Sequence, residues 1–186
     1  KEEKFCLINP ISGINNFSKG IGYFATSAIY YNNFEPEAAV MYDPIKDDLF
    51  CTEKGRGAFV NNSRIRFSST KSLENALFAF DDNKVFINFS KTPFFKEMGS
   101  ELRVFGCRCL DLAYLSSGKI DCYVSGEEFE KSPDPGILFV KESGGIMYKK
   151  QNLEKVFFCS NNYINDILDS KLWLLLKPIF HLLYLT

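Results

Sequence analysis

The side chains most able to do chemistry in this chain are six cysteines and a single histidine. The cysteines form none of the C-x-x-C pairs used by zinc sites and redox motifs, and they are too sparse in 186 residues for a disulfide framework. Cys107 and Cys109 flank Arg108, but no histidine lies near them in sequence to activate a thiol, so we expect both to be inert. His181 lies in an apolar tail. There, a histidine that is hydrogen-bonded or exposed to solvent is favoured over one that acts as a catalytic base. We therefore expect the cysteines to be reduced thiols, which indicates a cytoplasmic protein.

The composition is that of an ordinary globular protein. Apolar residues make up 46% of the chain and charged residues 24%, and 22 Lys and Arg nearly balance 23 Asp and Glu, for a net charge of −1. These values exclude the disordered, collagen-like and disulfide-scaffold classes. A near-neutral chain also has no general field that attracts nucleic acid, so direct nucleic-acid binding is not expected.

The most apolar segment covers residues 172–185 (LWLLLKPIFHLLYL). It is shorter than the ~20 residues that a spanning helix needs, and Lys177 and Pro178 interrupt it, so we expect no membrane span. We interpret it as a docking helix or an interface. A monotopic membrane anchor and an unrelated read-through tail are the alternatives. The first residues lack the long apolar region and cleavage site of a signal peptide.

Alternating apolar residues and turn residues predict an antiparallel meander over the first 67 residues. Phe5–Ile8 is expected to be a short buried strand that ends in a turn at residues 9–13. Ala25–Tyr31 and Glu37–Tyr42 flank a polar gap, which predicts a hairpin. Three further short strands are expected at residues 49–52, 58–60 and 64–67.

The second part of the chain predicts alternating strands and helices. Leu110, Ala113 and Tyr114 follow helical spacing, so a helix is expected over Cys109–Ser116, ending at Gly118. The other expected elements are strands at residues 77–80, 120–124 and 157–160, a weak helix at 96–102, and a helix at 135–143 closed by Gly144 and Gly145. We therefore expect two units, an antiparallel-sheet part at residues 1–70 and an α/β part with the apolar tail at residues 71–186.

Four stretches of the chain match the motifs of one protein family, in the same order. LINPISGINNF (residues 7–17) resembles the motif D-P-I-D-G-T-x-N-F with its leading strand, and KGRGAFVNN (54–62) resembles K-G-x-G-A-x-x-N-G. RVFGCRCLDLAY (103–114) with GKID (118–121) is similar to R-x-x-G-S-A-A-L-D-L-A-Y…G-R-x-D. KSPDPG (131–136) with VKESGG (140–145) is similar to W-D-x-A-P-G…V-x-E-A-G-G. The chain therefore resembles the inositol monophosphatase family, which includes the bacterial extragenic-suppressor-type phosphatases.

This resemblance implies a fold, a reaction and a cofactor. The fold class is a layered α/β (α+β) αβαβα sandwich, here expected to lack its first helical layer because the chain begins at the motif strand. Members are usually dimeric, and they use Mg²⁺ to hydrolyse phosphate monoesters such as inositol phosphates or related sugar phosphates. Mg²⁺ is a hard cation that needs carboxylate oxygens, which the motif aspartates supply. The implied partners are a phosphorylated small molecule and a second copy of the chain.

The chain departs from the family at the positions that would hold the metal. Asn9 and Ser12 replace the two aspartates of the first motif, and Ser132 replaces the aspartate of the W-D motif. Ile14 replaces the threonine that helps orient the attacking water in the family. Only the backbone carbonyl of Ile11 would remain as a ligand. A neutral pocket of this kind is expected to bind Mg²⁺ very poorly, so we predict little or no phosphatase activity.

The resemblance also assigns phosphate and substrate positions. Backbone N–H groups at Gly13 and Ile14 would cradle a phosphate. Gly106, Cys107, Arg108 and Ser125 occupy substrate-side positions, and Ser125 stands where many members carry a substrate-binding glutamate. Arg108 replaces a small residue, so it could project into the substrate cleft and hold a phosphate or acidic group, or it could be a surface arginine at a helix start.

Four acidic residues near Ser132 are the candidates to replace the lost ligands: Glu127, Glu128, Glu130 and Asp134. If Ser132 opens a helix, Asp134 would point about 200° away from it. We therefore favour a solvated acidic loop over a substitute metal site.

These observations leave three hypotheses. The first is a phosphatase-family protein that is catalytically impaired. The second is a non-catalytic binding or regulatory protein associated with transcription or RNA machinery, and the third is the product of a decaying gene. Without the first helical layer one sheet face would be exposed, which predicts aggregation or tight oligomerisation.

Overall fold

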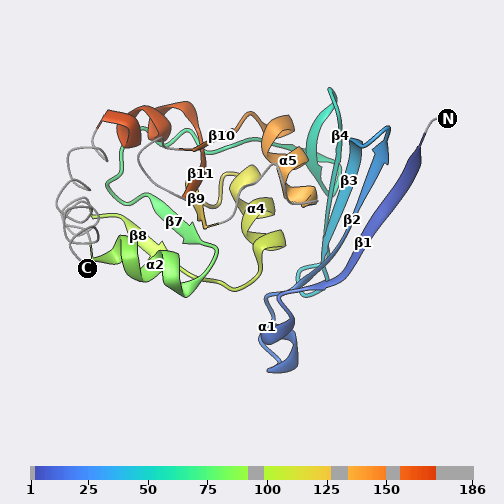
Figure 1. The fold of residues 1–186 in the computed structure, drawn as a ribbon, viewed down its shortest axis with the longest axis horizontal. Helices are drawn as coiled ribbons and strands as arrows, with labels where there is room; N and C mark the ends of the chain where they lie inside the picture. The colour runs from blue at the N-terminus through green and yellow to red at the C-terminus, as the bar shows by residue number, and fades with distance from the viewer. Residues whose placement is uncertain (1–2, 92–98, 127–133, 150–155, 171–186) are drawn as a thin grey trace, which may run out of the picture.

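Two β-sheets and the helices between and beside them form the fold. The computed structural model describes residues 3–91, 99–126, 134–149 and 156–170 (Figure 1). Within these residues no helix is long and apolar enough to cross a membrane. The apolar tail with His181, and three of the four acidic residues near Ser132, lie outside the described part.

The first sheet has six strands in the order β1-β2-β3-β4-β5-β6, and every neighbouring pair is antiparallel. This confirms the predicted meander and its first hairpin, whose turn residues Asn33 and Phe34 both have positive φ. The strands are β1 (Lys4–Ser12), β2 (Ala25–Asn32), β3 (Glu35–Asp43), β4 (Asp48–Glu53), β5 (Gly57–Val60) and β6 (Ser63–Ile65).

The prediction of a buried strand at Phe5–Ile8 is wrong. These residues belong to β1, which lies at the edge of the sheet and is mostly exposed along its length. An edge strand has a neighbouring strand on one side only, so its apolar run does not by itself indicate a central, covered position.

The second sheet has five strands in the order β10-β11-β9-β7-β8. β7 is parallel to both β8 and β9, whereas β11 is antiparallel to both β9 and β10. Leu102, expected at the end of a helix, lies instead in β8, where it pairs with Phe78. The strands are β7 (Leu77–Phe80), β8 (Glu101–Arg103), β9 (Cys122–Ser125), β10 (Ile146–Lys149) and β11 (Phe157–Ser160).

The helices begin and end at residues suited to those positions. In α5 the Asp134 side chain accepts a hydrogen bond from the Gly136 N–H, Pro135 occupies the first turn, and Gly144 ends the helix at a φ of 91°. Near its end, the Glu142 carboxylate accepts hydrogen bonds from two amides, one in the loop between β4 and β5 and one at the first residue of β5. The helices are α1 (Ile14–Ser18), α2 (Asn83–Ser90), α4 (Arg108–Ser116) and α5 (Pro135–Ser143), and residues 162–170 are also helical.

The elements stack in layers, with α4 and α5 between the two sheets (Figure 1). The apolar cluster around α4 and α5 includes Met41 and Phe50 of the first sheet and Tyr123 of the second. A second cluster packs α2 and residues 162–170 on the other face of the five-stranded sheet. The expected layered α/β fold is confirmed. Because the first cluster draws on both sheets, the division of the chain at residue 70 stays a prediction.

The face of the six-stranded sheet that points away from α4 and α5, here called the outer face, is apolar and open to solvent. Strand pairing aligns Ile8, Ala28, Val40, Cys51 and Phe59 across this face. Ile8 is 69% exposed and Val40 41% exposed. The outer face is therefore an apolar surface that the described residues leave uncovered.

Candidate functional site

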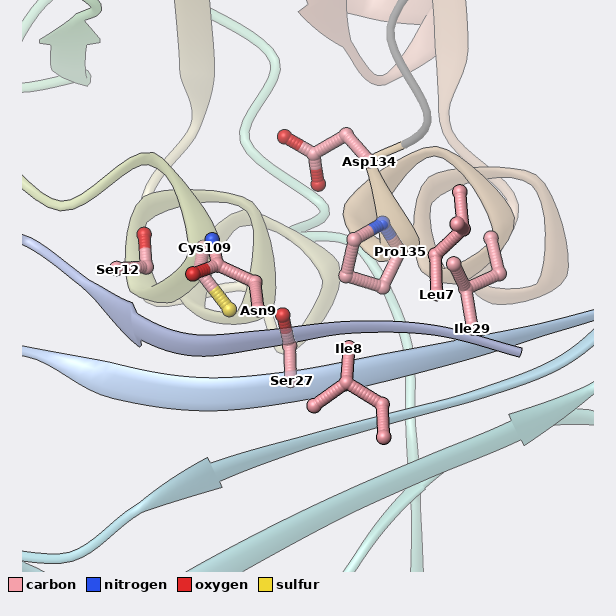
Figure 2. Close-up of a pocket in the computed structure, with 9 residues that line it drawn as sticks. All are labelled: Leu7, Ile8, Asn9, Ser12, Ser27, Ile29, Cys109, Asp134 and Pro135. Atoms are coloured by element: carbon pink, nitrogen blue, oxygen red, sulfur yellow. The ribbon is translucent and has the colours of Figure 1, made fainter.

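A pocket of about 360 Å³ lies between β1, β2 and the first turns of α4 and α5. Figure 2 shows that the side chains of Asn9 and Ser12 lie on the same side of β1 as Asp134, whereas Ile8 points away from them. The lining residues are Leu7, Ile8, Asn9, Ser12, Ser27, Ile29, Cys109, Asp134 and Pro135. The structure thus places two of the expected metal-ligand positions together in one concave site.

A distortion near the end of β1 brings Asn9 and Ser12 into this pocket. The register between β1 and β2 shifts between these two residues, and the Thr26 hydroxyl donates a hydrogen bond to the Pro10 carbonyl oxygen in the gap. Gly13 follows with a φ of 81°, and an added Cβ would lie 2.9 Å from the Cβ of Cys107. Glycine is therefore required here by both conformation and space.

The two cysteines beside the pocket are poor nucleophiles. The Cys107 thiol donates a weak hydrogen bond to the Ser12 carbonyl oxygen at 3.4 Å, and Cys109 lines the pocket. Burial raises the pKa of Cys107 and holds the pKa of Cys109 well above its usual value. Both thiols stay protonated at neutral pH, which supports the prediction that they are inert.

Arg108 forms a charged network directly behind the pocket wall. Its Nε lies 2.8 Å from Asp134 Oδ2, and its Nη1 lies 3.4 Å from Asp81 Oδ2. Asp81 also accepts hydrogen bonds from the hydroxyls of Ser125 at 2.7 Å and Tyr123 at 2.9 Å. The network thus joins four segments: the residue after β7, the first residue of α4, the end of β9 and the cap of α5.

One of the two expected positions of Arg108 is wrong, and the other stays a prediction. Its side chain is only 16% exposed, so the prediction of a surface arginine is wrong. The guanidinium contacts two carboxylates, those of Asp81 and Asp134, and its expected role in holding a phosphate or acidic group stays a prediction. Burial of a long cation is favourable only with such partners.

The prediction that Asp134 belongs to a solvated acidic loop is also wrong. Its side chain is 12% exposed, caps α5 and lines the pocket. The reason is that the described part of α5 begins at Pro135, so Asp134 is the cap that precedes the helix and does not point away on a helical turn.

Asp81 is a site residue that the sequence analysis did not single out. It directly follows β7, a short and fully apolar run. An acidic residue at the carboxyl end of a buried strand is a recognisable signal, because the ends of neighbouring parallel strands meet at one edge of a sheet. Ser27, a second pocket residue, gives no such signal within the alternating pattern of β2.

The remaining predicted site residues that the structure describes do not line the pocket. Ile14 begins α1 and is largely exposed, and Ile11 lies within the distorted end of β1. Gly106 has a φ of 79° before α4 and packs against Asn16. Ser132 lies outside the described residues. The phosphate role of Gly13 and Ile14 and the substrate roles of Gly106, Cys107, Arg108 and Ser125 stay predictions.

A second buried carboxylate lies one helical turn into α4. Asp111 is 1% exposed and accepts a hydrogen bond from the Tyr23 hydroxyl at 2.7 Å. Burial raises the pKa of Asp111 to about 7, with a further contribution from the negative charge of Asp81. Burial likewise raises the pKa of Tyr23 far above its ordinary value. Asp111 therefore changes charge near neutral pH inside the layer between the sheets.

The pocket residues that the structure describes do not fit a magnesium site. Asn9, Ser12 and Ser27 offer neutral oxygens, and the carboxylate of Asp134 is engaged by Arg108 and the Gly136 amide. In the described part of the chain no group of three or more His, Cys, Asp or Glu side chains is arranged to hold a metal ion. Mg²⁺ binds through carboxylates and dehydrates reluctantly, so this donor set lacks the charge to bind it.

Comparison with known proteins agrees with the motifs. The sequence pattern of the Inositol monophosphatase family matches residues 1–166. The Nus factor SuhB of Buchnera aphidicola is 34% identical over 176 residues, which cover 87% of this chain and 65% of that protein. The fructose-1,6-bisphosphatase/inositol-1-monophosphatase of Thermotoga maritima is 30% identical over 174 residues, 89% of this chain and 66% of that protein. The crystal structure of the extragenic suppressor protein SuhB from Bartonella henselae aligns with a TM-score of 0.77 at 30% identity, covering 90% of this chain and 68% of that one.

These findings define the class of the protein. The chain belongs to the inositol monophosphatase family, a family of phosphatases. Within that family it is similar to SuhB-type members, both in sequence and in fold. It spans just under two thirds of the length of the curated relatives described above.

Proposed function

We propose that this chain is a catalytically impaired member of its family, whose ancestral reaction is the Mg²⁺-dependent hydrolysis of phosphate monoesters. The observation that supports the proposal is the pocket itself, in which Asn9 and Ser12 stand at aspartate positions and Asp134 is paired with Arg108. Without ligand charge, Mg²⁺ is not retained, and uncatalysed hydrolysis of phosphate monoesters is too slow to replace it.

The experiment is phosphate release from inositol 1-phosphate with and without Mg²⁺. It compares the natural chain with the triple variant Asn9→Asp, Ser12→Asp and Ser132→Asp. We expect no release above background from the natural chain and Mg²⁺-dependent release from the triple variant, because the substitutions return carboxylates to the three positions where the family motifs carry aspartate.

A second triple variant controls for added negative charge. Ser63→Asp, Asn162→Asp and Ser170→Asp change three exposed positions away from the pocket and are expected to stay silent. Mg²⁺-dependent turnover by the natural chain would refute the proposal. Silence of the pocket variant, if it is folded by circular dichroism, would show that these three positions are not what limits activity.

A non-catalytic role is the second candidate, favoured by the similarity to proteins named as Nus factors. We propose that such a role would be a binding or regulatory one at the transcription or RNA machinery. Co-sedimentation of the purified chain with bacterial transcription elongation complexes tests it. Binding that persists in EDTA is the expected result, and its absence at micromolar concentrations would remove this candidate.

A further inference from the structure

Asp111 of α4 is a buried carboxyl outside the pocket. Its side chain is 1% exposed, and the Tyr23 hydroxyl donates the one side-chain hydrogen bond that it receives from the described residues, at 2.7 Å. Within the described part of the chain no lysine or arginine forms an ion pair with it. A buried carboxylate with one neutral donor and no cation is costly, so the surroundings of Asp111 favour the protonated carboxyl.

The titratable groups around Asp111 in the described structure supply no positive charge. Burial raises the pKa values of the phenols and thiols among them, so these groups stay neutral. Arg108 is paired with two other carboxylates, and Lys46, after β3, contacts the Tyr114 hydroxyl. The groups that act on Asp111 are Tyr23 before β2, Asp81 after β7, Tyr123 of β9, and Cys107 and Cys109 at the start of α4. Ionised Asp111 therefore gains most from contact with water.

The hydrogen-bond donor to Asp111 belongs to a sparsely packed segment, residues 13–24, which joins β1 to β2 and carries the projecting helix α1 (Figure 1). No residue of α1 is buried, and Ile14 is 65% exposed. Two side-chain hydrogen bonds tie the segment to α4 and the residues before it: Tyr23 to Asp111, and the Asn16 amide to the Phe105 carbonyl oxygen at 2.8 Å. Segments with so few buried contacts open at a lower free energy than the core.

We propose that Asp111 and Tyr23 form a proton-controlled latch, which holds residues 13–24 against α4 while the carboxyl is protonated and releases them as it ionises. Release hydrates the carboxylate, so a rise in pH favours the open segment. The pKa of Asp111 is about 7 in the closed structure and returns toward the ordinary value of ~4 on opening. The opening equilibrium is therefore expected to rise about ten-fold between pH 6 and pH 8.

The latch would couple the shape of the pocket to pH. The segment begins at Gly13, directly after the pocket residue Ser12, and Gly13 packs closely against Cys107. Release of the segment therefore frees the end of the pocket wall. Neither Asp111 nor Tyr23 lines the pocket, so the latch can be tested whether or not the chain hydrolyses phosphate esters.

Amide hydrogen exchange of the full chain, corrected for the intrinsic exchange rate at each pH, measures the opening. The reporters are the amides of Phe17 and Ile21, which donate to carbonyl oxygens within the segment, because so short a helix does not persist once released. Their protection is expected to fall about ten-fold from pH 6 to pH 8 in the natural chain. It is expected to stay constant in Asp111→Asn, whose amide does not ionise. Asp166→Asn, at an exposed position, is the control and should behave as the natural chain.

Dilute urea separates release of the segment from unfolding of the whole chain. The protection of Phe17 and Ile21 should not respond to it, since local release exposes little surface, whereas the protection of Phe78 in β7 should fall. Tyr23→Phe keeps the carboxyl and removes the contact, so it should lower the protection of the segment at both pH values and retain the pH dependence.

Titration of the Asp111 carboxyl by carbon-13 NMR needs no variant, and a midpoint near 7 is expected in the natural chain. The proposal is overturned if that midpoint lies in the ordinary range of a carboxyl, or if the protection of the segment does not change with pH. It is also overturned if the protection falls as much in Asp111→Asn, if Tyr23→Phe is protected as well as the natural chain, or if the segment responds to urea as β7 does.

Discussion

The two sheets of the molecule differ in how they are covered. In the five-stranded sheet both faces are buried, with Phe78 and Phe80 against α2 and Tyr123 against the layer of α4 and α5. In the six-stranded sheet Met41 and Phe50 are buried on one face, but Val40 and Leu49 on the outer face are exposed. Apolar residues occur on both faces of both sheets. The comparison shows that apolar character alone does not stabilise a strand, because the free energy comes from surface removed from water.

A matched pair of phenylalanines gives the largest expected difference between the sheets. Phe78→Ala in β7 removes a fully buried ring and is expected to lower the free energy of unfolding by about 3–5 kcal/mol. Phe59→Ala on the outer face removes a half-buried ring and is expected to lower it by about 1 kcal/mol. Urea denaturation of both variants measures the difference. Equal losses would mean that the outer face is covered in solution.

The layer between the sheets is expected to make stability depend on pH. Since the pKa of Asp111 is raised to about 7 in the folded chain, its protonated form favours folding. This stabilisation by protonated Asp111 is fully present below pH ~4, which is near the ordinary pKa of an aspartate carboxyl. It is lost as the pH rises through about 7.

Replacing this carboxyl should remove the dependence. When the pH rises from 5 to 8, the free energy of unfolding of Asp111→Asn is expected to increase by about 2 kcal/mol relative to that of the natural chain. The reason is that the amide cannot ionise. Denaturation curves at the two pH values measure it, and Asp47→Asn at an exposed position is the control. A constant difference between Asp111→Asn and the natural chain at both pH values would contradict the assignment.

The smallest effect on stability is expected on the outer face. Ile8→Thr combined with Val40→Thr should change the free energy of unfolding by no more than about 1 kcal/mol, because both side chains are largely exposed. The same pair should reduce the predicted self-association, as measured by light scattering, since it makes the patch more polar. Ile87→Thr on α2, 45% exposed, is the control and should leave association unchanged. A natural chain that is already a monodisperse monomer would refute the association.

Much of the fold could be predicted from local signals. The bounds of α5 follow from Pro135 at its start and Gly144 after its end, and β7 follows from a compact apolar run before Asp81. β10 was missed because the residues after Gly145 carry no alternation strong enough to indicate a strand. The exposure of β1 was missed because an apolar run does not reveal whether a strand lies at an edge or in the centre of a sheet.

The site was predictable in position but not in its interactions. The motifs singled out Asn9 and Ser12, and both line one pocket, where their role stays a prediction. The partners of Arg108 could not be predicted, because Asp81 and Asp134 are far from it in the sequence and only the packing of β7 and α5 beside α4 brings them together. Side-chain pairs at long sequence separation leave no local pattern.

Helix α5 is anchored at both ends by its own carboxylates. Asp134 ties its first turn to Arg108, and Glu142 accepts hydrogen bonds from the amides of Gly55, in the loop between β4 and β5, and Gly57, the first residue of β5. Helix α5 thus connects the β4–β5 region to the pocket wall. Neither the Asp134 contact nor the Glu142 contact involves Asn9 or Ser12. Residues on the β1 wall of the pocket can therefore be substituted without loss of either contact that holds α5 in place.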